Sequence, residues 1–189
     1  MNTPAHLLIG AAAFGKENQK ATTIAALLGA LTPDLSLYVM VSVSIWVLNI
    51  PPGIVFNELY FSNAWQRVFA IDNSFVLWGV ACGIAIWRRS AIFVAFTGAA
   101  LLHLAFDFPL HTEDARMHFW PISDWVFVSP VSYWDRTAYA GIVGPLELAT
   151  SGGAAYLIWR RGVPRLILCV VVALLAAEFL SSGIWQFIF

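Results

Sequence analysis

The chain has 189 residues, of which 60% are hydrophobic and only 11% charged, with a mean hydropathy of +0.76 and a formal net charge of −1. Soluble domains carry about 25% charged residues, so this composition predicts a single integral membrane domain that comprises residues 1–189. The nearly neutral charge provides no basic surface and excludes nucleic acid as an expected partner.

Apolar stretches bounded by charged residues predict one short helix followed by five spanning helices. Residues 3–14 are too few to cross a bilayer and favour a half-membrane or re-entrant helix, which we expect to remain in the mature protein. The longer stretches are residues 21–50, 67–87, 91–109, 137–159 and 165–189. Thr32-Pro33-Asp34 is expected to interrupt the first of these. The predicted fold class is all-α, a polytopic helical bundle in the membrane.

The one sizeable polar stretch, residues 110–136, also carries many aromatic residues and is expected to form an interfacial or periplasmic loop or lid. The short connections carry most of the basic residues, namely Lys16, Lys20, Arg88, Arg89, Arg160, Arg161 and Arg165. The positive-inside rule assigns these connections to the cytoplasm. The sequence therefore predicts a multi-pass protein of the bacterial inner membrane, with its site toward the periplasmic half.

A run of imidazoles and carboxylates begins inside the apolar stretch 91–109: His103, Asp107, His111, Asp114 and His118. Ionisable groups are costly within a bilayer and mark functional sites there. Imidazole and carboxylate together are ligands for zinc, manganese or iron. His103 and Asp107 are four residues apart and share one helix face, where they either bind one ion or hydrogen bond to each other.

Polar residues on all six predicted segments lie ten to fourteen positions from a basic connection: His6, Asp34, Ser74, His103, Glu147 and Glu178. Thirteen or fourteen helical residues span roughly 20 Å, so we expect these groups to share one layer in the outer half of the bilayer. His6 and Asp34 would then join His103 and Asp107 as ligands. Alternatively, Asp34 caps the turn after Pro33.

The residues after Pro109 offer acid–base and further ligand groups. We assign His111, Asp114 and Glu147 to the catalytic set, as acids or bases, and His118 to the metal ligands. Alternatively, His111, Asp114 and His118 are exposed polar residues of the loop. The alternative for Glu147 is a protonated, hydrogen-bonded acid without a catalytic role.

Three residues are assigned to substrate binding. Arg116 and Arg136 flank the loop and suit a phosphate anion, because guanidinium groups bind phosphate through paired hydrogen bonds. Ser74 lies at the depth of the site, where it contacts substrate or serves as the N-cap of the helix within residues 67–87.

Several motifs resemble a known family. His6 in Thr-Pro-Ala-His-Leu-Leu, Leu-Thr-Pro-Asp at 31–34 and the His103-x3-Asp107 pair resemble the bacterial inner-membrane metal-dependent hydrolases of the YdjM-like family, over most of residues 1–140. His-Phe-Trp-Pro at 118–121 and Ser-Pro-Val-Ser-Tyr-Trp-Asp at 129–135 resemble one branch of it. More remotely, the motifs are similar to zinc-dependent phospholipase C and P1 nuclease.

The resemblance implies that His6, Asp34, His103 and Asp107 are metal ligands, and the remote similarity implies phosphodiester hydrolysis at a multinuclear zinc site. Many relatives have a His-Ser pair where this chain has Asn73-Ser74. Either Asp72 substitutes for that ligand, or this branch binds one ion fewer.

The sequence thus predicts a metal-dependent hydrolase of a membrane lipid or lipid-linked phosphoester. Its expected cofactor is a divalent metal, zinc first, with manganese or iron as alternatives. A metal-ion or proton transporter ranks second, because the polar groups occupy one layer rather than a path. A structural membrane subunit with a non-catalytic metal ranks third, because structural zinc sites are usually rich in cysteine.

Overall fold

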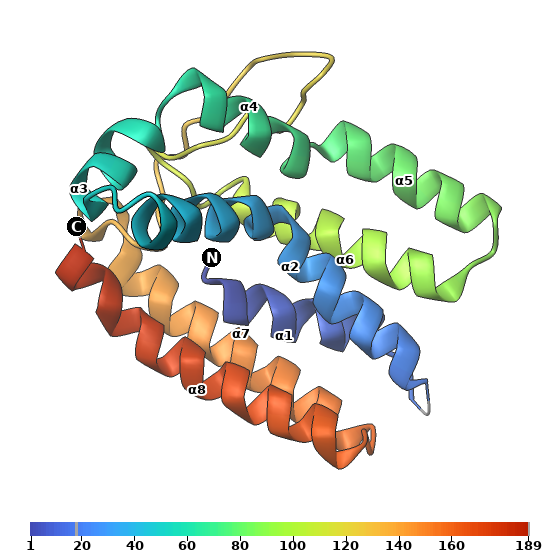
Figure 1. Ribbon diagram of the computed structural model, residues 1–189. Helices are drawn as coiled ribbons and strands as arrows, with labels where there is room; N and C mark the ends of the chain where they lie inside the picture. The colour runs from blue at the N-terminus through green and yellow to red at the C-terminus, as the bar shows by residue number, and fades with distance from the viewer. Residues whose placement is uncertain (18, 189) are drawn as a thin grey trace.

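The computed structural model describes residues 1–17 and 19–188, with side chains described through residue 181, as helices and one long irregular segment (Figure 1). The elements are α1 (Thr3–Phe14), α2 (Lys20–Ser42), the π-helix η1 (Val43–Val47), α3 (Pro52–Ile54), the π-helix η2 (Val55–Leu59), α4 (Asn63–Asp72), α5 (Phe75–Trp87), α6 (Ala91–Asp107), the 3-10 helix η3 (Arg136–Ala138), α7 (Ala140–Arg160) and α8 (Arg165–Ile188). These residues contain no β-strand, which confirms the all-α prediction for the described part of the chain.

The short helix α1 lies at the centre of the bundle, between α2 and α6 on one side and α7 and α8 on the other (Figure 1). Its sequence is apolar on nearly all sides, which is typical of a helix that is surrounded by others. Leu8 and Ala11 are buried against Ile158 of α7 and Val171 of α8. The position of α1 is therefore set by four neighbouring helices.

Small residues bring α2 and α6 into close contact. Ala26 and Ala99 are fully buried between the two helices. A Cβ atom added at Gly29 would lie 1.9 Å from the carbonyl oxygen of Phe96, so any larger residue would force the helices apart. This backbone-to-backbone contact fixes the spacing of the two helices that carry Asp34 and His103.

The three short basic connections lie at one end of the bundle, and the long segment before η3 lies toward the other end (Figure 1). A direct bond joins two of them: Arg161 Nη1 donates to the carbonyl oxygen of Gly15 at 2.8 Å. The predicted grouping of the basic connections agrees with this arrangement. The side of the membrane that they face stays a prediction.

The predicted interruption of the second segment at Pro33 is wrong, because α2 continues through this residue. Thr32 Oγ1 donates to the carbonyl oxygen of Leu28 at 2.8 Å, and Asn73 Nδ2 donates to the carbonyl oxygen of Pro33 at 3.3 Å. Hydrogen bonds from side chains thus support the backbone around a proline that lacks its own donor.

The predicted span 67–87 lies within a helical stretch that consists of two helices, α4 and α5, which meet at Asn73 and Ser74. Ser74 is the N-cap of α5, because its hydroxyl oxygen accepts from the backbone N–H of Leu77 at 3.0 Å. The N-cap interpretation of Ser74 is therefore confirmed.

Residues 108–135 form turns without a helix or strand, and aromatic side chains fold this segment onto itself. The ring of Phe108 lies 4.9 Å from that of Phe127 and 6.0 Å from that of Phe119. The backbone N–H of Phe75 donates to the carbonyl oxygen of His118 at 2.8 Å. The segment predicted as a loop or lid is thus a packed cover attached to α5.

Two helical stretches of the described residues are long and apolar enough to cross a membrane, Lys20–Val47 and Asn63–Trp87. The described parts of the other three predicted spans, in α6, α7 and α8, are not among these two, so the count of five spans stays a prediction. Large apolar side chains such as Ile84, Leu146 and Leu166 are exposed on α5, α7 and α8. Exposed apolar surface of this kind is typical of contact with a membrane or another protein.

Candidate metal centre

Three buried side chains that meet at the centre of the bundle come from two helices. His6 lies in the first turns of α1, which begins at Thr3 and has Pro4 as its second residue, where a missing N–H is tolerated. His103 and Asp107 lie in the last turns of α6, four residues apart and therefore on one face. Helix α6 ends at Asp107, two residues before Pro109, which has no N–H to continue the helical hydrogen bonds.

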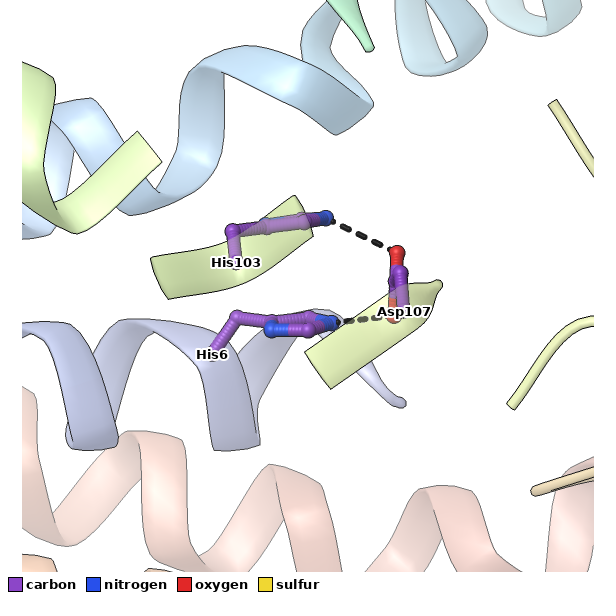
Figure 2. Close-up of side chains that lie close together, drawn as sticks. All are labelled: His6, His103 and Asp107. Carbon is purple, nitrogen blue, oxygen red and sulfur yellow. Dashed lines mark hydrogen bonds and ion pairs between the residues drawn. The ribbon is translucent and has the colours of Figure 1, made fainter. Parts of the chain in front are cut away.

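Figure 2 shows the two imidazole rings side by side, with the carboxylate of Asp107 facing both. His6 Nε2 lies 2.8 Å from Asp107 Oδ1, and His103 Nε2 lies 3.0 Å from Asp107 Oδ2. The rings are stacked, with centroids 3.6 Å apart and planes 10° from parallel. One ligand atom from each residue lies within 4.8 Å of the other two. We call these three residues the His–Asp group.

The other ring nitrogen of His103 is held by the backbone of α2. Its Nδ1 lies 2.7 Å from the carbonyl oxygen of Ala30. Because a carbonyl can only accept, Nδ1 carries the hydrogen, and in the neutral ring Nε2 carries the lone pair that a metal requires. A hydrogen bond of this kind orients metal-binding histidines.

Asp34 of α2 borders the His–Asp group. Its Oδ1 lies 3.6 Å from His103 Nε2, and its Oδ2 accepts from Thr3 Oγ1 at 2.5 Å. The Thr3 hydroxyl also lies 2.6 Å from the hydroxyl of Tyr38. Asp34 is therefore oriented as a neighbouring oxygen donor. Sequence reasoning found Asp34 but missed Tyr38, although a spacing of four residues on one helix was the available signal.

The His–Asp group fits a divalent cation by donor type, burial and charge. Two imidazole nitrogens and a carboxylate oxygen suit zinc, and also manganese or iron. Asp107 is buried, and a buried carboxylate is costly without a positive partner. In the structure the amino nitrogen of Met1 lies 2.6 Å from Asp107 Oδ1, so a positively charged group contacts this oxygen. The stacked rings favour neutral imidazoles that share one cation over two imidazolium ions.

His111 joins the His–Asp group to Asp114. Its Nε2 lies 3.3 Å from Asp107 Oδ2, and its Nδ1 lies 2.8 Å from Asp114 Oδ2, which also accepts from Trp134 Nε1 at 3.2 Å. Burial alone would lower the pKa of His111, but the carboxylates of Asp107 and Asp114 raise it to about 9. Burial opposes ionisation of Asp114, yet the charge of His111 holds the pKa of that carboxyl below its ordinary value.

His118, predicted as a further ligand, lies apart from the His–Asp group. Its Nδ1 donates to the carbonyl oxygen of Arg116 at 3.0 Å, and its ring lies 5.5 Å from those of Phe75 and Phe108. Burial among these aromatic rings lowers its pKa to about 4, so the ring is neutral at pH 7. His118 is therefore not one of the three described residues whose possible ligand atoms lie within 4.8 Å of one another.

Arg116 is buried, with only 7% of its surface exposed. Its guanidinium carbon lies 4.0 Å from the ring centroid of Phe69 and 4.9 Å from that of Tyr60. Among the described residues, its Nη1 atom meets no hydrogen-bond acceptor. A buried charged donor without an acceptor is costly, so this nitrogen is suited to an anionic ligand.

The other predicted site residues lie elsewhere. Arg136 is exposed in η3. The Ser74 hydroxyl caps α5 and donates to the carbonyl oxygen of Trp120. Glu147 is buried on α7, and its Oε1 accepts from the backbone N–H of Asn2.

Comparison with known proteins finds no matching family model, curated protein or solved structure. The family resemblance of the sequence motifs therefore stays a prediction, and the function is inferred from the geometry of the site.

Proposed function

We propose that this protein is a membrane-embedded, metal-dependent hydrolase of a lipid or lipid-linked phosphoester. The observation that carries the proposal is the buried His–Asp group, whose ligand atoms lie within 4.8 Å of one another. His6, His103 and Asp107 would hold the cation, and Asp34 is near enough to contribute a further oxygen. A bound divalent cation would supply Lewis acidity, which makes water more acidic and draws charge from a phosphoryl oxygen.

Arg116 supports a phosphoester rather than a neutral substrate. Its buried guanidinium stacks on Phe69, and the unpartnered Nη1 would donate to a phosphoryl oxygen. Arg136 is exposed and is the weaker candidate for this role. We therefore assign the substrate anion to Arg116.

His111 is the group best placed to exchange a proton beside the cation. It lies between Asp107 and Asp114, and the bond from its Nδ1 to Asp114 fixes the orientation of its ring. An imidazole held by a carboxylate on one side is a common arrangement for general acid–base catalysis. Asp114 would act by positioning His111.

A lipid substrate is supported by the apolar surface beside the site. The packed cover, which consists of residues 108–135, exposes the side chains of Ile122, Trp125 and Val128. Aromatic and aliphatic side chains of this kind bind at the boundary of headgroups and acyl chains. A substrate whose phosphate reaches Arg116 would keep its chain in the bilayer.

The packing of α2 against α6 favours a hydrolase over a cation conduit. On the side of the basic connections, the helices meet backbone to backbone at Gly29 and Phe96. A conduit requires polar groups that continue through this region. The buried residues of this contact are mainly alanines, including Ala26 and Ala99.

The test is phosphoester hydrolysis by the full chain in detergent, loaded with Zn²⁺ or Mn²⁺. The panel would contain a phospholipid, a polyprenyl phosphate and a soluble phosphodiester. We expect turnover of a lipid phosphoester that is lost in Asp107→Asn and reduced about 10- to 100-fold in Arg116→Met, with Arg136→Met as the matched arginine control. Metal-loaded protein without turnover of any panel member, or turnover that survives in Asp107→Asn, would overturn the proposal.

A further inference from the structure

The N-terminal end of α1 is buried inside the bundle, where water cannot satisfy its backbone. The first N–H groups of a helix have no acceptor within the helix. Pro4 removes one of these donors, and the side chain of the N-cap residue Asn2 accepts no capping bond. Acceptors for this helix end must therefore come from other parts of the chain.

Glu147 of α7 and Glu178 of α8 supply those acceptors. Glu147 Oε1 accepts from the backbone N–H of Asn2, and Glu178 Oε1 accepts from Asn2 Nδ2 at 3.1 Å. The Asn2 carbonyl oxygen in turn accepts from the backbone N–H of Ala5 at 3.1 Å, so both glutamates hold the residue that begins the first turn. Both glutamates are buried, and negative groups at a helix N-terminus interact favourably with its dipole. We call Glu147 and Glu178 the capping pair.

The capping pair acts on the same helix turn that carries His6. Asn2 and His6 are four residues apart, and the His6 N–H donates to the Asn2 carbonyl oxygen at 3.3 Å. Because α1 has only 12 residues, a shift of its first turn moves His6 relative to Asp107 of α6. The hydrogen bonds to Asn2 thus hold His6 Nε2 at its distance of 2.8 Å from Asp107.

We propose that Glu147 and Glu178 are positioning residues that cap α1 from two neighbouring helices and thereby set the cation affinity of the His–Asp group. Among the described residues, neither glutamate belongs to the His–Asp group, whose ligand atoms lie close together. In each glutamate the Oε1 atom accepts the bond from Asn2, and Oε2 has no hydrogen-bond partner among the described residues. A neutral glutamine can therefore replace one member and keep its acceptor oxygen.

This inference rests on the cation site of the proposed function, and its test compares substitutions that keep or remove the acceptor. Zn²⁺ affinity would be measured by titration calorimetry on the full chain in detergent. We expect Glu178→Leu and Asn2→Ala to bind about tenfold more weakly, and Glu178→Gln to stay within about twofold of the wild type. Glu58→Leu, at an exposed glutamate, is the matched control.

The outcomes separate the capping role from the alternatives. Equal affinity in Glu178→Leu and the wild type would overturn the proposal, and equal loss in Glu178→Leu and Glu178→Gln would identify Glu178 as a ligand instead. The absorption band of bound Co²⁺ should be unchanged in Glu178→Gln. Should Glu178→Leu fail to fold, Asn2→Ala gives the same comparison with a small truncation.

A cation-independent measurement distinguishes failure of this inference from failure of the proposed function. If the wild type binds no cation, the hydrolase proposal fails, and amide hydrogen exchange in α1 still tests the capping pair. Faster exchange at the first turn of α1 in Glu178→Leu than in Glu178→Gln would support capping. Equal exchange rates in the two variants would overturn it.

Discussion

Gly29→Ala should destabilise the protein and weaken cation binding together. The added Cβ would lie 1.9 Å from the Phe96 carbonyl oxygen, whereas ordinary contacts begin near 3.4 Å, so α2 and α6 must separate by about 1.5 Å. Overpacking costs about 1–3 kcal/mol, and strain on the bond from His103 to Ala30 adds about 1 kcal/mol. The better helix propensity of alanine returns about 1 kcal/mol. The net loss is about 2 kcal/mol.

Thermal unfolding in detergent measures this loss as a fall of about 4–8 °C in the midpoint temperature. Gly79→Ala on α5 is the matched control, because a Cβ added there meets no atom within 4 Å. We expect the control to be unchanged or slightly more stable and to bind Zn²⁺ normally. Equal midpoints for the two variants would refute the close contact of α2 and α6. A destabilised Gly29→Ala with unaltered Zn²⁺ affinity would refute its coupling to the site.

Three further predictions concern the site and its cover. Thr3→Val should weaken Zn²⁺ binding several-fold because it frees Asp34, whereas Thr3→Ser should not, and calorimetry that finds the two equal would refute this role. EDTA should lower the unfolding midpoint of the zinc-loaded wild type by about 5 °C or more, but not that of Asp107→Asn, and equal sensitivity would refute binding by the native state. Between pH 6.5 and about 4, His118 binds a proton in the unfolded state but not in the folded state. The free energy of unfolding therefore decreases by up to about 3 kcal/mol as the pH is lowered through this range. His118→Gln should show a flatter pH profile of unfolding midpoints, and identical profiles would contradict the burial of His118.

Much of the helical arrangement could be predicted from the sequence, because apolar runs bounded by charge are long and clear. The bounds of α1 agree with the prediction, since Pro4 and Gly15 limit the run. The continuation of α2 through Pro33 could not be predicted, because the hydrogen bond that supports the helix there comes from Asn73, forty residues away in the sequence. The contact at Gly29 likewise depends on a partner that is remote in the sequence.

The candidate metal residues could be predicted because buried ionisable groups are costly and therefore rare. His6, His103 and Asp107 come together as expected, and Asp34 borders them. The position of His118 relative to the metal ligands could not be predicted, because the chain is no longer helical after α6 and helical spacing does not apply there. The bond from His103 to the carbonyl oxygen of Ala30 was equally hidden, since a backbone partner leaves no signature in the sequence.

The most direct test of the central claim is the metal content of the purified full chain after loading with Zn²⁺ and removal of free ion. We expect about one equivalent in the wild type and in His118→Gln, and none in His103→Ala or Asp107→Asn when unfolding confirms that these variants are folded. Absence of zinc from the wild type, or zinc retained in Asp107→Asn, would contradict the assignment of the His–Asp group as a metal centre.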